Sequence, residues 1–265
     1  PGLTGTYGAA VAAGRVFGLD AHQLANALGI AGSLSSGLLA FTKSEHGAMI
    51  KRLHLGRASE SGILAARLAL DGYTGPETVL EGKFGFLDAY CNDADCDPKL
   101  LTAELGKTWE TSLICMKRYA CHVNAHTPVQ ALRELMAEHA FQGTEVAHVR
   151  VEGSARLLSH HNISEPGDIM KAQYSVPFCV ALALFRDPDD PRSFDASSLD
   201  DSTIRAACRN LELRLLEDGG NSVRSSRVTV RLKDGREFAR ARDTYKGTPR
   251  EPLSRAELRR KFMLL

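Results

Sequence analysis

The chain lacks long apolar runs and a strong net charge. None of its apolar stretches reaches the ~20 residues that a membrane-spanning helix requires. Its 33 basic and 32 acidic side chains leave a net charge of +1, whereas nucleic-acid-binding proteins usually carry a basic surplus on one face. We therefore expect neither a membrane nor a nucleic acid as a partner.

Several motifs of known chemistry are missing as well. The absence of G-x-G-x-x-G and of a P-loop argues against nucleotide chemistry, and no G-x-S-x-G nucleophile elbow is present. The acidic stretch 92–97 lacks the central Gly and the final Glu of a calcium loop, so it reads as an acidic turn. His160 and His161 have no partners at metal-ligand spacing and are expected in a surface loop. We expect no metal and no cofactor.

The six cysteines form no Cys-x-x-Cys pair, and most stand among apolar or helical residues. Isolated reduced thiols are the expectation for a chain of this size. No charged start followed by an apolar stretch indicates a signal peptide. The expected compartment is the cytoplasm, or the mitochondrial matrix in a eukaryote. The chain starts at Pro1 without a Met, so we expect a fragment, or a numbering that omits earlier residues.

Two basic clusters stand out: Lys51-Arg52-Leu53-His54 and Lys117-Arg118-Tyr119-Ala120-Cys121-His122. Each places a lysine and a histidine a few residues apart, beside small or apolar residues. A Lys/His pair can hold a carboxylate and also move a proton. The clusters indicate a site for a small anionic molecule.

The first half of the chain is expected to be helical and rich in Ala, Leu and Gly. The small and apolar run 7–17 is expected to end at Gly18, and Asp20 with Gln23 forms a capping box for the next helix. A third helix is predicted over residues 58–70, and a short one restarts after Pro76. Successive helices without intervening strands indicate an all-α layer.

The second half alternates between helix and strand signals. Thr127 with Gln130 forms a capping box for a helix, and residues 147–151 alternate as a half-buried strand. The apolar run 176–185 is expected to be a buried helix, with a buried strand as the alternative.

Further strands are expected over residues 211–215 and 228–232. The turn Asp234-Gly235 then predicts a hairpin through residue 238. Ser254 and Glu257 cap a final helix that is expected to pack on the first helices. The expected fold is mainly α with an α+β second domain: residues 1–115 and 246–265 form a helical domain, and residues 116–245 form an α+β lid.

Five stretches of this chain resemble the 2-methylcitrate dehydratase family (MmgE/PrpD), which includes cis-aconitate decarboxylase and iminodisuccinate epimerase. These are Thr4-Gly5-Thr6-Tyr7-Gly8 with 19–32; Lys51 to Ala58; Gly72-Tyr73-Thr74-Gly75-Pro76 with Leu80-Glu81-Gly82 and Gly85-Phe86; Lys117 to His122; and Tyr245-Lys246-Gly247 to Phe262. They span nearly the whole chain in the family's order.

The resemblance implies a large helical domain, a smaller lid and an active site between them. It assigns Lys51 and His54 to the helical side, and Lys117 and His122 to the lid boundary. It also implies that an N-terminal helical portion, which supplies an Asp and a His, is absent here. A further family His aligns with Gly2. Some family members carry a Tyr where Phe178 stands, and Tyr174 lies one helical turn earlier.

The resemblance implies a lyase that acts on a small di- or tricarboxylate, such as 2-methylcitrate or cis-aconitate, by acid/base chemistry. Lys117, His122 and His54 are the expected catalytic residues. Lys51, Arg57 and Tyr174 are the expected substrate-binding residues. Alternatives are a dicarboxylate isomerase or epimerase, a truncated inactive remnant that binds anions or serves as a structural partner, and a chain completed by a second polypeptide. A homodimer through the helical domain is also implied, and an incomplete helical domain would leave apolar surface uncovered.

Overall fold

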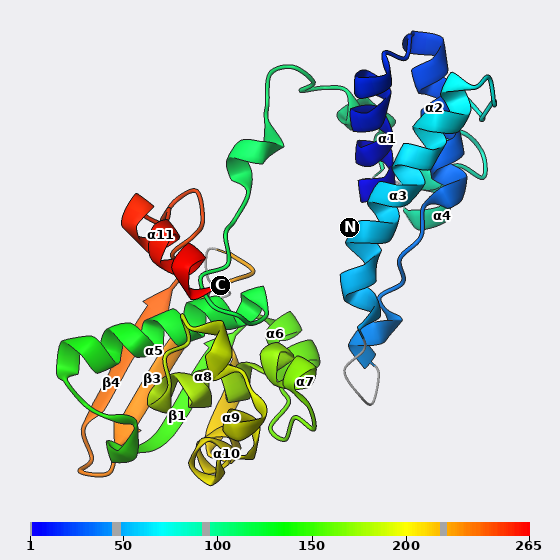
Figure 1. Cartoon of the computed structure of the whole chain (residues 1–265). Coiled ribbons are helices and arrows are strands. Elements are labelled where there is room, and N and C mark those ends of the chain that lie inside the picture. The colour runs from blue at the N-terminus through cyan, green and yellow to red at the C-terminus, as the bar shows by residue number, and fades with distance from the viewer. Residues whose placement is uncertain (1, 44–48, 92–95, 218–221) are drawn as a thin grey trace. The chain divides into compact units, whose positions relative to one another are not determined.

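The computed structural model describes residues 2–43, 49–91, 96–217 and 222–265. The chain divides into two compact units, the first extending to Thr108 and the second running from Trp109 to Leu265. Figure 1 labels their helices and strands. Among the described residues, no helix combines the length and apolar character needed to cross a membrane.

The first unit is helical, as predicted. Its helices are α1 (Thr4–Phe17), α2 (Ala21–Leu34), α3 (Ile50–Leu70) and the short α4 (Phe86–Tyr90), with 3₁₀ turns at Ala40–Lys43 and Pro98–Leu101. Helices α1, α2 and α3 pack against one another (Figure 1). Alanines dominate their shared core: Ala10, Ala27, Ala31, Ala65, Ala66 and Ala69, with Leu19 and Ile30. Small side chains let the helix backbones approach closely.

The capping box that opens α2 is confirmed. The Gln23 N–H donates to Asp20 Oδ1 at 2.8 Å, and the Asp20 N–H donates to Gln23 Oε1 at 3.1 Å. The third helix is longer than predicted, because α3 begins at Ile50 rather than at residue 58. It therefore includes the whole first basic cluster.

The short helix predicted after Pro76 is wrong. Residues 73–76 take an irregular path against α2, where the Gly75 N–H donates to Asn26 Oδ1 at 3.0 Å. Gly29 permits this approach, since a Cβ there would lie 2.7 Å from backbone atoms of Gly75 and Pro76. Contact with α2 therefore determines the local path, and the next helix starts only at Phe86.

Apolar side chains are exposed on α1 and α3. Val16 is 83% exposed, Ile63 51% and Leu64 47%. Uncovered apolar surface on the helical part was expected, and these residues confirm it.

The second unit contains a four-stranded mixed sheet in the order β2-β1-β3-β4. Its strands are β1 (Val146–Gly153), β2 (Leu211–Leu215), β3 (Ser226–Leu232) and β4 (Glu237–Arg242). β1 pairs with β2 in parallel and with β3 antiparallel. β3 and β4 form the predicted hairpin across Asp234-Gly235. β1 places Val149 and Val151 in the core, as its alternation predicted.

The helices of this unit pack either on the sheet or on one another (Figure 1). They are α5 (His126–His139), α6 (Ala155–His161), α7 (Ile169–Tyr174), α8 (Val176–Phe185), α9 (Ala196–Asp200) and α10 (Ser202–Arg209), with 3₁₀ turns at Glu110–Leu113, Val123–Ala125, Gly143–Glu145 and Pro191–Ser193. Residues 176–184 of α8 are all buried, so the apolar run is a core helix and not a strand.

The capping box predicted for α5 is wrong. The helix begins at His126, one residue before Thr127, and its N-cap makes no side-chain hydrogen bond. The Thr127 hydroxyl instead donates to the Arg224 carbonyl at 2.7 Å, and the side-chain Oε1 of Gln130 accepts from the Lys246 N–H at 2.7 Å. Tertiary contacts use the side chains that a local cap would need.

The final helix, α11 (Arg255–Leu264), has the predicted capping box between Ser254 and Glu257. The return of this helix to the helical domain stays a prediction. Its residues belong to the second compact unit, where Arg260 Nη2 donates to Asp189 Oδ2 at 2.7 Å. An ion pair between Lys246 and Glu257, at 3.3 Å, joins its first turn to the preceding loop.

We predict that Gly29→Ala destabilises the first unit by about 1–3 kcal/mol, because the added Cβ overlaps the backbone of residues 75–76. Urea unfolding measures the effect. The control is Gly8→Ala on α1, where an added Cβ meets nothing within 4 Å. This control should stabilise the first unit by about 0.5–1 kcal/mol, because Ala has a higher helix propensity than Gly. Equal effects of the two substitutions would contradict this account.

Candidate functional site

The second basic cluster forms a tight turn ahead of α5. Lys117 Nζ donates to the Cys121 carbonyl at 3.0 Å, and the His122 N–H donates to the Gln173 carbonyl at 2.7 Å. The first bond closes the turn, and the second joins it to the end of α7. Residues that are 51 apart in the sequence are thereby held side by side.

His126 shapes this turn from the inside. Its side chain is fully buried, and its Nε2 accepts from the Tyr119 N–H at 3.3 Å. Its Nδ1 lies 3.2 Å from the His122 carbonyl, which can only accept, so Nδ1 carries the hydrogen. His126 is therefore a structural residue of the turn.

Three aromatic rings meet beside the turn. The His122 ring centroid lies 4.1 Å from that of His161, at an interplanar angle of 29°, and 4.7 Å from that of Tyr174. The His161 and Tyr174 centroids are 5.6 Å apart. We call these residues the three-ring cluster. It brings two of the predicted site residues, His122 and Tyr174, into contact.

The prediction that His160 and His161 lie in a surface loop is wrong. Both belong to α6, and His161 is only 3% exposed. Its Nδ1 lies 3.0 Å from the Tyr174 carbonyl. The helical spacing of Leu157 and His161, four residues apart and both buried, is a signal that could have identified the buried face.

Lys117 is exposed. The apolar run that precedes it in the sequence predicts a partly buried amine, but Leu113 is 55% exposed, Ile114 64% and Met116 50%. The run does not enter the core. The amine is instead held near the turn by its bond to the Cys121 carbonyl.

Two buried thiols lie beneath the turn. Burial raises the pKa of Cys121, but a hydrogen bond with Cys179, together with the nearby His126 and Lys117, prevails and lowers it. Burial raises the pKa of Cys179, and the bond to Cys121 raises it further. All six cysteines are free, as predicted.

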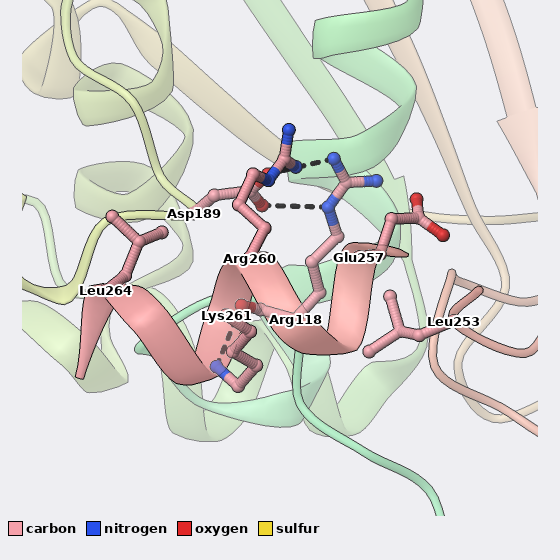
Figure 2. A pocket seen from close by; sticks show the side chains of 7 residues that line it. All are labelled: Arg118, Asp189, Leu253, Glu257, Arg260, Lys261 and Leu264. Atoms are coloured by element: carbon pink, nitrogen blue, oxygen red, sulfur yellow. Dashed lines mark hydrogen bonds and ion pairs between the residues drawn. The ribbon is translucent and has the colours of Figure 1, made fainter. Parts of the chain in front are cut away.

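A charged network anchors the residue next to Lys117. Arg118 donates to both carboxylate oxygens of Asp189, at 2.8 and 2.9 Å, and Arg260 of α11 donates to the same carboxylate. Lys261 Nζ donates to the Arg118 carbonyl at 3.2 Å. Figure 2 shows these side chains around a small pocket between α11 and the turn, with Leu253, Glu257 and Leu264 on its wall. The hydrogen bond with Asp189 raises the pKa of the Arg118 guanidinium.

The first basic cluster lies in the opening turns of α3, in the other unit. Lys51 is exposed, and His54 is half-buried with its ring edge-on to Phe41 at 5.8 Å between centroids. Arg57 is exposed and donates to Glu60 Oε2 at 2.7 Å, one turn along the helix. Lys51 and His54 are three residues apart, so they share one helix face.

The predicted site residues thus form two groups, one in each unit. Lys117, His122 and Tyr174 lie near one another in the second unit, and Lys51, His54 and Arg57 lie on α3. Their convergence on one substrate stays a prediction. Phe178, at the family's Tyr position, is 1% exposed in the core, whereas the half-buried Tyr174 contacts His122.

The side chains of the second-unit group are suited to a small anion. The ammonium of Lys117 can hold a carboxylate, and the half-buried imidazole of His122 can donate or accept a hydrogen bond. Within the described ranges, no three His, Cys, Asp or Glu side chains are grouped so that they could hold a metal ion.

The fold is that of a two-part protein: a helical unit followed by an α+β unit whose first turn presents Lys, Arg and His. The MmgE/PrpD N-terminal domain matches residues 1–99, and the MmgE/PrpD C-terminal domain matches residues 119–265. The chain belongs to the MmgE/PrpD family, as the sequence resemblance predicted. The C-terminal domain includes α11, in agreement with the contacts of that helix.

Curated relatives of this chain are cis-aconitate decarboxylases. The human protein is 28% identical over 270 residues, which are 99% of this chain and 54% of that protein. The Aspergillus terreus protein is 28% identical over 282 residues, 98% of this chain and 56% of its own length. The mouse protein is 25% identical over 270 residues. The chain therefore spans about half the length of the curated relatives it matches.

We predict that Asp189→Asn loosens the turn that carries Lys117 and His122. Removing the charge leaves two guanidinium groups facing each other. The loss in free energy of unfolding should lie between the ~1 kcal/mol for breaking a surface ion pair and the ~3–5 kcal/mol for breaking a buried one. Amide hydrogen exchange should become faster in residues 117–122.

Asp190→Asn is the matched control. Asp190 pairs with Arg192 two residues away, at the surface. Exchange in residues 117–122 should not change in this variant. If Asp189→Asn also left their exchange unchanged, the network would not anchor the turn.

Proposed function

We propose that this chain is part of a lyase that removes a carboxylate group, as carbon dioxide, from a small tricarboxylate of the cis-aconitate type. The supporting observation is the three-ring cluster beside Lys117, which places an imidazole, a phenol and an ammonium-bearing turn together in a chain whose curated relatives are cis-aconitate decarboxylases. Because the chain spans about half of those relatives, the activity of the whole protein is part of the proposal.

The chemistry requires two kinds of group. When the bond from carbon to the departing carboxylate breaks, its electron pair stays on the carbon and spreads towards a neighbouring carboxylate, and a new C–H bond then forms. Cations that hold the remaining carboxylates stabilise this charge, each charge-assisted hydrogen bond contributing about 1.5–3 kcal/mol. Hydrogen-bond donors and proton carriers complete the reaction.

In this proposal Lys117 binds a carboxylate, and His122 acts at the reacting end of the substrate. Tyr174 lines the same place. From the helical unit, Lys51 binds a second carboxylate, His54 assists proton transfer and Arg57 contributes charge. The Arg57–Glu60 pair must open for Arg57 to take part. Arg57 is therefore the residue of this set with the weakest support.

A dehydratase acting on 2-methylcitrate and an epimerase need the same parts, because each generates an anion next to a carboxylate. The names of the curated relatives favour decarboxylation. We also propose a homodimer, for which the exposed apolar residues of α1 and α3 offer a surface. Light scattering would measure the mass, and a monomer at micromolar concentration would contradict the dimer.

We predict that the protein releases carbon dioxide from cis-aconitate, and that Lys117→Ala lowers kcat/KM about 10- to 150-fold through the loss of one charge-assisted hydrogen bond. The assay uses the 265-residue chain and the whole protein that its gene encodes. Lys233→Ala is the control, since Lys233 is an exposed lysine of the same unit in the β3–β4 hairpin.

The same assay with 2-methylcitrate, followed by the appearance of a double bond, separates decarboxylase from dehydratase. Folding of each variant is checked by its thermal unfolding. A folded whole protein without turnover on any of these acids would contradict the proposal and favour an inactive anion-binding remnant. An equal loss in the Lys117 and Lys233 variants would remove Lys117 from the site.

A further inference from the structure

His161 is anchored so that its ring faces the ring of His122. The Tyr174 carbonyl can only accept a hydrogen bond, so the His161 Nδ1, at 3.0 Å, carries the hydrogen. That bond ties the end of α6 to the end of α7 and determines where the His161 ring lies. The ring then stacks on His122 with centroids 4.1 Å apart.

The hydrogen of the His122 ring is placed by the backbone. His122 is the N-cap of the 3₁₀ turn Val123–Ala125, and the Asn124 N–H donates to its Nδ1 at 3.3 Å. A backbone N–H can only donate, so Nδ1 is an acceptor without a hydrogen. The neutral His122 ring therefore carries its hydrogen on Nε2.

Neighbouring groups disfavour a second proton on this ring. A hydrogen on Nδ1 would point at the Asn124 N–H. The ring also stands at the start of the helical segment that continues into α5, where a positive charge is unfavourable. Lys117, which donates to the adjacent Cys121 carbonyl, adds a nearby ammonium. The titratable groups that the described contacts place near the ring include His161, Tyr174, His126 and the Cys121 thiol.

The three histidines of this region therefore differ in which nitrogen bears the hydrogen. His126 and His161 each donate from Nδ1 to a carbonyl, whereas His122 accepts at Nδ1. A neutral imidazole that keeps its hydrogen on Nε2 is a hydrogen-bond donor at that atom. Such a ring can stabilise developing negative charge without transferring its proton.

We propose that His161 is a positioning residue: together with the Asn124 N–H it holds His122 as a neutral imidazole with its hydrogen on Nε2, so that His122 serves as a hydrogen-bond donor to a carboxylate or to the developing anion. This role rests on the proposed function, which names the anion. It also refines that function, because the proton that forms the new C–H bond then comes from another group. The tautomer itself can be tested without turnover.

The test is long-range ¹H–¹⁵N NMR of the imidazole rings in the histidine-labelled chain between about pH 7 and 8.5, where neutral rings dominate. The two neutral tautomers differ in which ring nitrogen shows the shift of a protonated nitrogen. We expect the hydrogen on Nε2 in His122, and on Nδ1 in His126 and His161. His122→Gln identifies the His122 signals by their loss.

Two substitutions test the ring of His161 and its hydrogen bond separately. His161→Asn keeps a donor for the Tyr174 carbonyl but removes the ring, and His122 should lose its single-tautomer pattern. His161→Phe keeps a flat ring, and the pattern should stay as in the parent chain. His160→Ala is the control, because His160 is the exposed neighbour and bonds only locally, to Ser159. It should change nothing at His122.

In the active protein, kcat should fall about 10- to 100-fold in His161→Asn and recover in His161→Phe. A hydrogen on Nδ1 of His122, or a His122 that is doubly protonated throughout this range, overturns the proposal, as does a His161→Asn spectrum identical to the parent. These spectra decide the tautomer even if the parent protein turns over none of the acids, which would instead refute the proposed function. If His161→Asn fails to fold, the spectra of the parent and of His161→Phe still decide the tautomer of His122.

Discussion

The hydrogen bond from the His122 N–H to the Gln173 carbonyl, at 2.7 Å, joins the two segments on which the candidate site depends. It holds the turn after Lys117 against the end of α7. Tyr174 follows Gln173 directly, so the same bond brings its ring to His122, and the Tyr174 carbonyl in turn orients His161. A single backbone contact therefore determines which side chains of this unit lie together.

Other contacts hold the turn at its N-terminal end. The Met116 N–H donates to the Gly247 carbonyl at 2.7 Å, and Gly247 has φ 113°, with a Cβ position only 2.1 Å from the Met116 carbonyl oxygen. Only glycine fits there without strain. Gly247 lies in one of the stretches that carry the family resemblance, and its contact explains why this residue type is required. The Arg118–Asp189–Arg260 network adds a charged anchor one residue further along.

Features that depend on neighbouring residues could be predicted from the sequence. The capping boxes at Asp20 and Ser254 need partners three residues away, and both form. Thr127 has the same pattern, but its hydroxyl bonds to a carbonyl 97 residues later. His161 was misplaced for the same reason, because its ring partner His122 and its hydrogen-bond partner Tyr174 lie in other segments. The family resemblance identified His122 and Lys117, yet it gave no indication of what lies against them.

The path of the backbone, more than any side chain, determines what the His122 ring can do. Its Nδ1 accepts from a main-chain N–H, so most substitutions at Asn124 would leave that donor in place, and only proline would remove it. His126, four residues later, faces a carbonyl instead and holds its hydrogen on the other nitrogen. The backbone at the start of one helical segment thus favours opposite tautomers in His122 and His126, because one Nδ1 faces an N–H and the other faces a carbonyl. An assignment of acid and base roles from residue type alone would treat them as equivalent.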